Sequence, residues 1–381
     1  MNTPVIVLIG NYPLDRQESM LRFRDLLQVQ LEARGYTTES IFPRGWVGLL
    51  SRAGGLGKWL GYVDKYILFP FSLGLQLGAL KKKYPGRKIV VHICDHSNAV
   101  YVAVAKRWFP VVVTCHDLLA VRGAMGEDTD CPASGFGKKL QAAILRGLGE
   151  ATAVVCVSSA TRGDLVRLGV PGVAARTHFV PLALNYAYRA LSRDEAMAVL
   201  KRAGLDLAYQ GYIFHVGSSL RRKNRAALVL AAAEIGSEWT GRIAFAGEPL
   251  SAEERAVVES SGLGARVREI SRPDNETLDA LYSAALCFVF PSRFEGFGWP
   301  VLEAQMAACP VICSNRTSVP EVAGEGALVH EPDDYAGMAR DIRRLQDAAF
   351  RDSVIALGLK NAQGYTNERM MRAYEEIYRE I

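Results

Sequence analysis

The chain has 381 residues, more than a single ordinary hydrophobic core holds, and this length suits two domains of common size. Hydrophobic residues make up 49% of it and charged residues 22%, which is typical of a globular protein and excludes a disordered one. The net charge of +5, from 45 basic and 40 acidic residues, is small for this length, so we expect no nucleic-acid partner.

Seven cysteines follow no metal-binding or redox spacing, and most lie in apolar runs, which is typical of a reducing compartment. The segment Met1–Pro4 carries no basic region, and the apolar run after it is too short for the core of a signal peptide. No run of about 18 apolar residues occurs, so we expect no membrane-spanning helix. These features predict a cytoplasmic protein.

Short apolar runs alternate with longer amphipathic segments along the chain. Strands are predicted at 4–10, 89–94, 111–115 and 154–157, with helices at 15–34, 98–108 and 137–149. The pattern restarts with strands at 211–216, 242–246, 266–270, 286–290, 311–313 and 327–330, a helix at 224–235 and helices between most of the other strands. Residues 181–209 are predicted to be a linker, and 367–381 a charged amphipathic helix. The alternation predicts two α/β domains, each with a parallel sheet and crossover helices.

Polar and glycine-rich segments follow several of these strands. Open parallel sheets bind ligands beyond the carboxyl ends of their strands, so these segments hold the candidate site residues. They are Gly10-Asn11, Asp95-His96, His116-Asp117, Gly217–Lys223 and Pro291–Gly298.

The string Phe294–Glu303 (FEGFGWPVLE) carries the strongest functional signal. It joins the strand at 286–290 to a predicted helix at 299–308. Gly296 and Gly298 let the backbone turn sharply and approach a ligand. The N–H groups at the helix start are expected to face an anion such as a diphosphate.

Two carboxylates frame the same loop. Glu295 is expected to bind hydroxyls of a sugar, and Glu303 is expected to bind hydroxyls of a ribose. Either glutamate alone is explained more simply as a complement to the helix macrodipole. Together with an anion-binding backbone that includes Gly296, Phe297 and Gly298, they predict a sugar-nucleotide site.

The segment FPSRFEGFGWPVLEAQMAACPVICSN is similar to the Glu-x7-Glu signature of retaining glycosyltransferases of group 1 (family 4), which adopt the GT-B fold. The resemblance extends over most of the chain and is most specific in the second half; Trp299 stands where the family has a leucine. It implies two Rossmann-like α/β domains that face each other across a cleft. Residues 1–185 would bind the acceptor and 186–365 the sugar nucleotide, while the C-terminal helix at 366–381 would pack back on the N-terminal domain.

The segment VGSSLRRKN (216–224) is similar to the family's phosphate-clamping segment. The resemblance implies that Lys223 neutralises the donor diphosphate, with Arg222 as an assistant. The family often has an arginine where this chain has Ser218. Without the downstream motif, the segment is explained equally by a solvated basic loop.

The segment VTCHD (113–117) resembles the family's histidine motif in the first domain. His116 would bind the donor sugar and stabilise positive charge at the anomeric carbon through its backbone carbonyl. Asp117 would orient His116 or contact the acceptor. A histidine after a strand is often only structural. His96 matches no motif and is a weaker acceptor-binding candidate.

Three further segments complete the predicted site. Gly10 follows the first strand, where the family brings a glycine loop towards the diphosphate, although a simple turn explains it equally well. The main chain near Ile270 is implied to bind the base. Asp128-Thr129-Asp130 lies in a polar loop, so no metal ligand is predicted there. No cofactor is expected beyond the donor substrate, a UDP- or GDP-sugar.

The resemblance thus implies a retaining, metal-independent hexosyltransferase with His116, Glu295 and Lys223 as catalytic residues. It would move a hexose from a nucleoside diphosphate sugar to a glycan or lipid-linked acceptor in surface polysaccharide or glycolipid synthesis. Three alternatives stay open: a sugar-nucleotide epimerase of the same fold, a non-catalytic sugar-nucleotide binder, and a glycoside hydrolase that uses Glu295 and Glu303.

Residues 44–83 combine aromatic, aliphatic and basic side chains, which suits the headgroup layer of a membrane. The residues concerned are Trp46, Leu49, Leu50, Leu56, Trp59, Leu60, Arg44, Arg52, Lys58, Lys65 and Lys81–Lys83. A core-facing helix followed by an acceptor-loop segment is the competing interpretation. Membrane binding would place the protein peripherally on the cytoplasmic face and would favour a lipid-linked acceptor.

Overall fold

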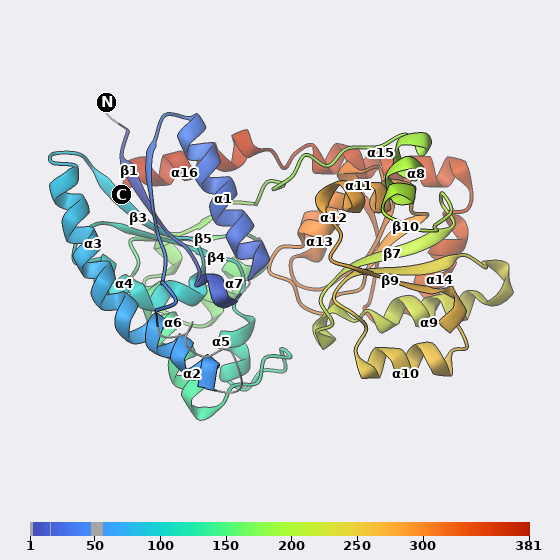
Figure 1. Cartoon of the computed structure of the whole chain (residues 1–381), viewed down its shortest axis with the longest axis horizontal. Helices are drawn as coiled ribbons and strands as arrows, with labels where there is room; N and C mark the ends of the chain where they lie inside the picture. Colours follow the sequence, from blue (N-terminus) through green and yellow to red (C-terminus); the bar gives the residue numbers. More distant parts are fainter. Residues whose placement is uncertain (1–2, 16, 47–55) are drawn as a thin grey trace. The chain divides into compact units, whose positions relative to one another are not determined.

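The computed structural model describes residues 3–15, 17–46 and 56–381, and the chain divides into two compact units (Figure 1). Unit 1 comprises Met1–Asn185 together with Asn367–Ile381, and unit 2 comprises Tyr186–Thr366. Each unit has its own parallel sheet and its own hydrophobic core, so the expected α/β fold class is confirmed.

The sheet of unit 1 contains, among the described residues, six parallel strands in the order β2-β1-β3-β4-β5-β6. They are β1 (Val5–Ile9), β2 (Thr37–Ile41), β3 (Ile89–Ile93), β4 (Val111–Cys115), β5 (Ala153–Cys156) and β6 (Thr177–Phe179). The four central strands match the expected apolar runs. The edge strands β2 and β6 carry polar side chains, so no apolar run in the sequence predicts them.

Helices cover both faces of this sheet (Figure 1). They are α1 (Glu18–Ala33), α2 (Leu56–Val63), α3 (Phe69–Lys83), α4 (Val102–Ala105), α5 (Leu119–Ala124), α6 (Gly135–Glu150), α7 (Ser159–Arg167) and α16 (Asn367–Glu380), and a π-helical segment, Asp64–Leu68, joins α2 to α3. The helical stretch expected near 98–108 is present, but it begins earlier and is divided into a 3-10 segment (His96–Tyr101) and the short α4. It begins earlier because Asp95 caps the turn directly after β3. Within the described ranges, no helix is both long enough and apolar enough to cross a membrane.

A chain of buried hydrogen bonds attaches α16 to the sheet of unit 1. The ring of His92 in β3 lies 2.6 Å from the hydroxyl of Tyr378 through Nδ1 and 2.8 Å from that of Thr114 through Nε2. The hydroxyl of Tyr374 lies 3.0 Å from the same Thr114 oxygen. Because each of these polar groups is buried and paired, the contact fixes both the position and the rotation of the helix.

The sheet of unit 2 contains, within its described residues, six parallel strands in the order β12-β11-β10-β7-β8-β9. They are β7 (Tyr212–Gly217), β8 (Arg242–Gly247), β9 (Val267–Ser271), β10 (Cys287–Phe290), β11 (Val311–Ser314) and β12 (Ala327–His330). All six were expected from the sequence, within one or two residues at their ends.

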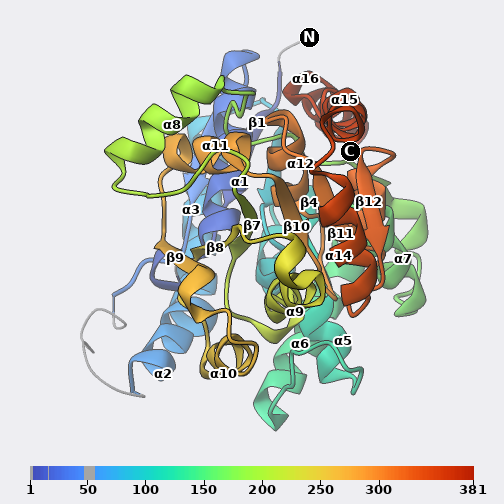
Figure 2. The same cartoon turned by 90° about the vertical axis from the view of Figure 1, so that its right-hand side faces the viewer.

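The helices of unit 2 are arranged on the two faces of its sheet, as Figures 1 and 2 show. They are α8 (Arg193–Arg202), α9 (Ala226–Ile235), α10 (Ala252–Ser260), α11 (Asn275–Ala284), α12 (Trp299–Met306), α13 (Val319–Ala323), α14 (Tyr335–Arg344) and α15 (Ala348–Ala362). The predicted linker at 181–209 contains the boundary between the two units, at Asn185, and also the helix α8, which was not predicted. This helix starts with a capping box between Ser192 and Glu195, a signal that the sequence carries.

The strand order reverses once in each sheet. The reversal lies between β1 and β3 in unit 1 and between β7 and β10 in unit 2. Beside such a reversal the crossovers leave on opposite faces, so the strand ends are open to a ligand. The segments at these two places are Gly10-Asn11 with Asp95-His96, and Gly217–Lys223 with Pro291–Gly298.

A histidine between two carboxylates joins β12 to α14. His330 at the end of β12 lies 2.8 Å from Asp341 through Nε2 and 3.1 Å from Asp334 through Nδ1. The hydrogen bond to Asp341 raises the pKa of His330, burial opposes the shift, and the bond to Asp334 adds to it. The imidazolium therefore stabilises the folded state most below its unfolded pKa, and this contribution is lost as the pH rises through the raised folded pKa.

We expect this contact to make the stability of unit 2 depend on pH. The difference in unfolding free energy between wild type and His330→Gln should be greatest near about pH 6 and should shrink towards about pH 9, because glutamine stays uncharged throughout. Urea unfolding at several pH values measures the difference. A difference that does not change with pH would contradict the ion pair.

Candidate active site

The two loops at the reversal of unit 2 meet through one carboxylate and two cations. Glu295, in the loop after β10, receives a hydrogen bond of 2.7 Å from Lys223 Nζ at its Oε1. Its Oε2 lies 3.4 Å from a terminal nitrogen of Arg222. Lys223 and Arg222 belong to a 3-10 turn after β7, so the sequence-predicted diphosphate clamp and sugar-binding glutamate lie in direct contact.

The charge state of Glu295 follows from these contacts. Its side chain is buried, with 9% exposed, and burial alone would raise the pKa of the carboxyl. The charges of Lys223 and Arg222, and the hydrogen bond from Lys223, outweigh burial and hold the pKa below its ordinary value. The carboxylate is therefore ionised at neutral pH and acts as a hydrogen-bond acceptor only.

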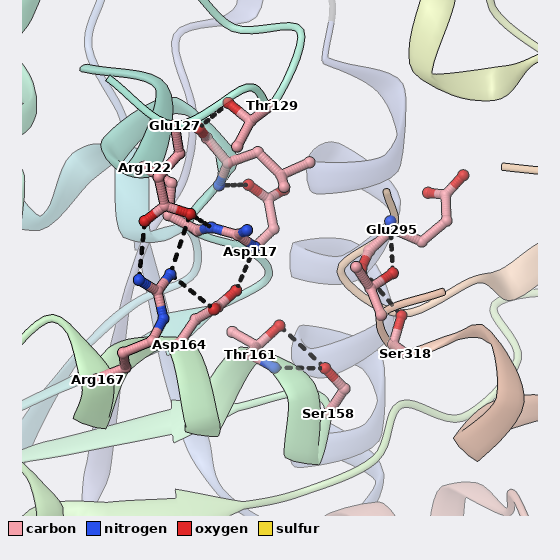
Figure 3. Close-up of polar contacts among 12 residues, drawn as sticks. Asp117, Arg122, Glu127, Thr129, Ser158, Thr161, Asp164, Arg167, Glu295 and Ser318 are labelled. Atoms are coloured by element: carbon pink, nitrogen blue, oxygen red, sulfur yellow. Dashed lines mark hydrogen bonds and ion pairs between the residues drawn. The ribbon is translucent and has the colours of Figure 1, made fainter. Parts of the chain in front are cut away.

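Hydrogen bonds to the backbone hold the loop around Glu295 in place (Figure 3). The hydroxyl of Ser318 lies 2.8 Å from the carbonyl of Phe297 and 3.0 Å from that of Glu295. The N–H of Glu295 donates to Thr317 Oγ1 at 3.0 Å. Arg222 also donates to the carbonyl of Phe294 at 3.0 Å, so one guanidinium contacts both the carboxylate and the backbone of the loop.

The glycine-containing part of the loop leads into α12. Gly298 has φ +112°, a left-handed conformation that strongly favours glycine, and α12 begins at the next residue. Pro300 lies in the first turn of α12, where its missing N–H costs nothing. Phe297 is buried, and its ring contacts that of Tyr365 at 6.0 Å between centroids. The positive end of the α12 dipole thus lies at the loop that carries Glu295.

Glu303 lies one turn further along α12 and is buried. Its Oε2 accepts a hydrogen bond of 3.0 Å from the hydroxyl of Tyr282 in α11. The sequence does not indicate this partner, since tyrosine in an amphipathic helix is commonly a core residue. Ile270 lies in the edge strand β9 and is buried, two strands away from the reversal.

His215 is a further residue at this site that was not predicted from the sequence. His215 in β7 is fully buried, and its Nδ1 lies 2.9 Å from the carbonyl of Val289 in β10. Its ring stacks against the neighbouring rings of Phe288 and Phe290, at 6.1 and 5.9 Å between centroids. The only sequence signal was a histidine two residues before Gly217 in an apolar strand, which is usually a core residue.

In unit 1, His116 follows β4 and is buried. Its Nε2 lies 2.9 Å from the carbonyl of Cys94, and its ring packs edge-on against Phe23. Burial lowers the pKa of His116, although the charge of Asp95 opposes the shift. The neutral ring must therefore carry its proton on Nε2, which leaves Nδ1 as a hydrogen-bond acceptor.

The reversal in unit 1 is occupied by a buried polar network around Asp95. The carboxylate accepts a hydrogen bond of 2.5 Å from Asn11, and Ser97 donates to it from both its N–H and its hydroxyl. Asn98 donates to Asn11 at 3.0 Å, and His96 Nδ1 lies 3.1 Å from the carboxylate. His96 and the segment after β1 are thus held together, as expected for strand ends at a reversal.

The other two candidates of unit 1 have local partners. Asp117 accepts a hydrogen bond of 3.0 Å from the N–H of Leu119 and so shapes the start of α5. Gly10 lies against the side chain of Arg24, and a Cβ there would come within 3.1 Å of the Arg24 Cδ. Neither contact excludes a ligand, and their roles stay predictions.

A network of four charged side chains connects α5 to α7 (Figure 3). Arg122 donates to Glu127 and Asp164 at 2.8 Å each, and Arg167 contacts the same two carboxylates. The neighbouring Asp128-Thr129-Asp130 loop is held by the Thr129 hydroxyl, which donates to the carbonyl of Leu119. In the part of the chain that the structure describes, no group of three or more His, Cys, Asp or Glu side chains could hold a metal ion.

Family models match both halves of the chain. The model described as glycosyl transferases group 1 matches residues 206–355, and the model described as glycosyltransferase family 4 matches residues 27–187. The chain is 33% identical over 235 residues to the O-antigen chain mannosyltransferase B of Escherichia coli, which covers 60% of this chain and 61% of that protein. It is 29% identical over 341 residues to D-inositol 3-phosphate glycosyltransferase 1 of Catenulispora acidiphila, covering 83% and 78%.

The chain therefore spans less than two thirds of the length of the E. coli protein. Among solved structures, it is similar to the sucrose-phosphate synthase of Thermosynechococcus elongatus, with a TM-score of 0.76, 21% identity and coverage of 100% and 99%. It is also similar to the HepE protein of Anabaena in complex with UDP, with a TM-score of 0.69, 14% identity and coverage of 99% of both chains. At these identities the likeness concerns the fold.

The hydroxyl of Ser318 offers a test of how the Glu295 loop is held. Ser318→Ala should reduce the free energy of unfolding by about 1–2 kcal/mol, because the two loop carbonyls that share its single O–H lose that donor. Ser353→Ala is the control, since its exposed hydroxyl donates within α15. Urea denaturation compares the two variants, and equal, small effects would show that the Ser318 contact does not hold the loop.

Proposed function

The chain belongs to the group 1 glycosyltransferases with the GT-B fold, and from this premise we propose that it transfers a hexosyl residue from a nucleoside diphosphate sugar to a hydroxyl group of a glycan or lipid-linked acceptor. The observation that carries the proposal is the contact of Glu295 with Lys223 and Arg222 at the strand reversal of unit 2. This contact places two cations, which suit a diphosphate, beside the ionised carboxylate of Glu295, which suits the hydroxyl groups of a sugar.

The donor diphosphate binds at the loops after β7 and β10. Its negative charge competes with Glu295 for Lys223 and Arg222, and the N-terminal end of α12 adds a favourable dipole. As the bond to the sugar breaks, negative charge grows on the diphosphate oxygens. The two cations then stabilise the transition state more than the ground state, which is what accelerates the reaction.

Glu295 exchanges partners in this scheme. In the structure its carboxylate is paired with the two cations, and with donor bound it accepts hydrogen bonds from sugar hydroxyls. Because its pKa is held low, it does not take a proton from the sugar or act as a general base. Its role is to orient the sugar for attack.

His116 contributes a neutral imidazole. Since Nε2 donates to the carbonyl of Cys94, the nitrogen that is left for a ligand is Nδ1, which accepts a hydrogen bond from a hydroxyl of the sugar. The carbonyl of His116 lies 3.4 Å from the hydroxyl of Thr161, a long contact that an electron-poor anomeric carbon can replace. His116 thus has two roles that do not interfere with each other. Its Nδ1 accepts a hydrogen bond from the sugar, and its backbone carbonyl stabilises positive charge at the anomeric carbon.

The reaction retains the configuration of the sugar without a protein nucleophile. The bond between the anomeric carbon and the diphosphate oxygen breaks, and the electron pair stays on that oxygen. The acceptor oxygen bonds to the anomeric carbon on the same face, and its proton passes to the leaving diphosphate. No metal ion takes part, since Lys223, Arg222 and the helix dipole neutralise the leaving group. Mannose is the sugar that the name of the E. coli relative favours, with GDP or UDP as the carrier.

The Glu295→Gln variant tests the sugar-orienting role. We predict a fall in turnover of about 100-fold or more, the size seen when a transition-state hydrogen bond is removed. The affinity for the free nucleoside diphosphate should stay the same or rise, because the carboxylate no longer competes for the two cations. Steady-state kinetics and calorimetry with UDP and GDP measure the two quantities.

The matched control is Glu325→Gln, an exposed glutamate of the same unit. It should leave both quantities unchanged. Full turnover in Glu295→Gln would contradict the proposal. Conversion of the donor without an acceptor would identify an epimerase, and return of an unchanged donor would identify a binder.

The acceptor side of the proposal includes peripheral contact with a membrane through α3. Its inner face is buried through Phe69, Leu73, Leu77 and Leu80. Its outer face carries Phe71 and Leu75, which are 75% and 64% exposed, and Ile67 continues the row at 63%. A helix with apolar residues on both faces needs a second partner, and Figure 1 shows α3 at the edge of unit 1 beside α4.

Charge indicates that this partner is an anionic lipid surface. The apolar row is followed by the exposed Lys81 and Lys82, and each lysine near such a surface adds about 1 kcal/mol of binding. Lys65 is excluded from this role, because it pairs with Asp15 at 2.8 Å and lies over the ring of Tyr62. Lys83 is excluded for the same reason, because it pairs with Glu39 at 2.6 Å. Residues 47–55 of the predicted region lie outside the described residues. The contact surface is therefore Ile67, Phe71, Leu75, Lys81 and Lys82, and it favours a lipid-linked acceptor.

Vesicle sedimentation tests this surface. Wild type should bind vesicles that contain phosphatidylglycerol at low salt. The double variant Phe71→Ser/Leu75→Ser should bind at least about tenfold more weakly, because two apolar side chains that would be buried in the membrane are lost. Val29→Ser is the control, since Val29 is 60% exposed on α1 of the same unit. Absence of wild-type binding at low salt would refute the membrane contact.

A further inference from the structure

His215 is a fully buried histidine at the reversal in unit 2, and the proposed reaction does not use it. The described pairing of β7 with β10 covers Ile213 and Phe214, and the ring of His215 continues the link by bonding to the carbonyl of Val289 at 2.9 Å. A carbonyl only accepts, so Nδ1 carries the proton. The other nitrogen, Nε2, is then an acceptor.

This second nitrogen has no hydrogen-bond partner among the described residues. An unpaired acceptor in a core destabilises the fold, and a phenylalanine would pack against Phe288 and Phe290 without that cost. Burial lowers the pKa of His215 to about 3, with the bond to Val289 opposing and the cations Lys223 and Arg225 adding to the effect. The imidazole is therefore neutral, and protonation does not satisfy Nε2.

The unpaired nitrogen faces the loop that would bind the diphosphate. A Cβ added to Gly217 would lie 3.2 Å from Nε2 of His215 and 3.9 Å from Cδ of Lys223. The two side chains therefore lie on either side of the space that a Cβ would fill. The ammonium of Lys223 lies 5.4 Å from the centre of the Phe290 ring, against which His215 also stacks. Glycine at 217 therefore keeps the space between the histidine and the lysine open.

We propose that His215 is a positioning residue for Lys223, and that Nε2 accepts a hydrogen bond from the ammonium when the donor diphosphate draws it away from Glu295. The inference rests on the proposed function. An ammonium has three N–H donors, and with the sugar nucleotide bound two oxygens of the diphosphate and Nε2 of His215 accept from them. A lysine with three fixed acceptors is held in one geometry, whereas a lysine with one acceptor rotates freely.

Two substitutions separate the two nitrogens of His215. Asparagine places an N–H near the position of Nδ1, so His215→Asn keeps the bond to Val289 and removes the acceptor near Lys223. Glutamine reaches the position of Nε2, so His215→Gln keeps that acceptor and loses the bond to Val289. If His215 is only structural, the asparagine variant should retain more activity than the glutamine variant. If it positions Lys223, the glutamine variant should retain more activity than the asparagine variant.

The experiment measures binding of UDP and GDP by calorimetry, together with turnover and thermal unfolding. His215→Asn should weaken nucleoside diphosphate binding and lower turnover about tenfold, the size of one hydrogen bond to a charged group, while His215→Gln stays within about threefold of wild type. In a Lys223→Ala background, His215→Asn should have no further effect, because the residue acts through Lys223.

Three results would overturn the inference: equal loss in the asparagine and glutamine variants, additive effects of His215→Asn and Lys223→Ala, or no binding of either nucleoside diphosphate to the wild type. Binding that follows the predicted order in a protein that does not transfer sugar would support the role of His215 and refute the proposed transfer. Thermal unfolding shows whether each variant is folded. If one variant has lost its fold, nucleotide binding is compared between the wild type and the variant that remains folded.

Discussion

The contact of Glu295 with Lys223 and Arg222 is the interaction on which the candidate site of unit 2 depends. Lys223 and Arg222 precede Glu295 by 72 and 73 residues, and they reach it because β7 and β10 are neighbours at the reversal of strand order. A buried carboxylate without partners would be strongly destabilising. The pairing compensates the burial of the carboxylate, keeps it ionised, and holds together the charges that the proposed contacts to a diphosphate and a sugar require.

The two units use the same position in the sheet for different chemistry. At its reversal, unit 2 gathers charged side chains, whereas unit 1 gathers the amides of Asn11 and Asn98 around one ionised residue, Asp95. Beside this network, burial keeps His116 neutral. Two cations beside a carboxylate suit a diphosphate, and amides around a carboxylate beside a neutral imidazole suit hydroxyl groups. The proposed function uses this division, with the diphosphate at the loops of unit 2 and a sugar hydroxyl at His116.

The sequence predicted what depends on local pattern. Central strands such as β4 are continuous apolar runs because both of their faces are buried, and the loop at Glu295 is marked by its glycines and by Pro300. The edge strands β2 and β6 lack such a run. The helix α8 was not predicted, because half of its residues are charged and its apolar pattern is short. Contacts between residues far apart in the sequence could not be predicted from local pattern. The hydrogen bond from Tyr282 to Glu303 and the unpaired nitrogen of His215 both depend on which strands and helices become neighbours.

Hydrogen–deuterium exchange of the wild-type chain, with and without UDP or GDP, tests the central claim most directly. The account predicts protection in the two loops at the reversal of unit 2, residues 217–225 and 291–299, with no change in α3. Protection confined to the strand ends of unit 1, or absent from both loops of unit 2 at saturating nucleotide, would contradict the assignment of the donor diphosphate to Lys223, Arg222 and the Glu295 loop.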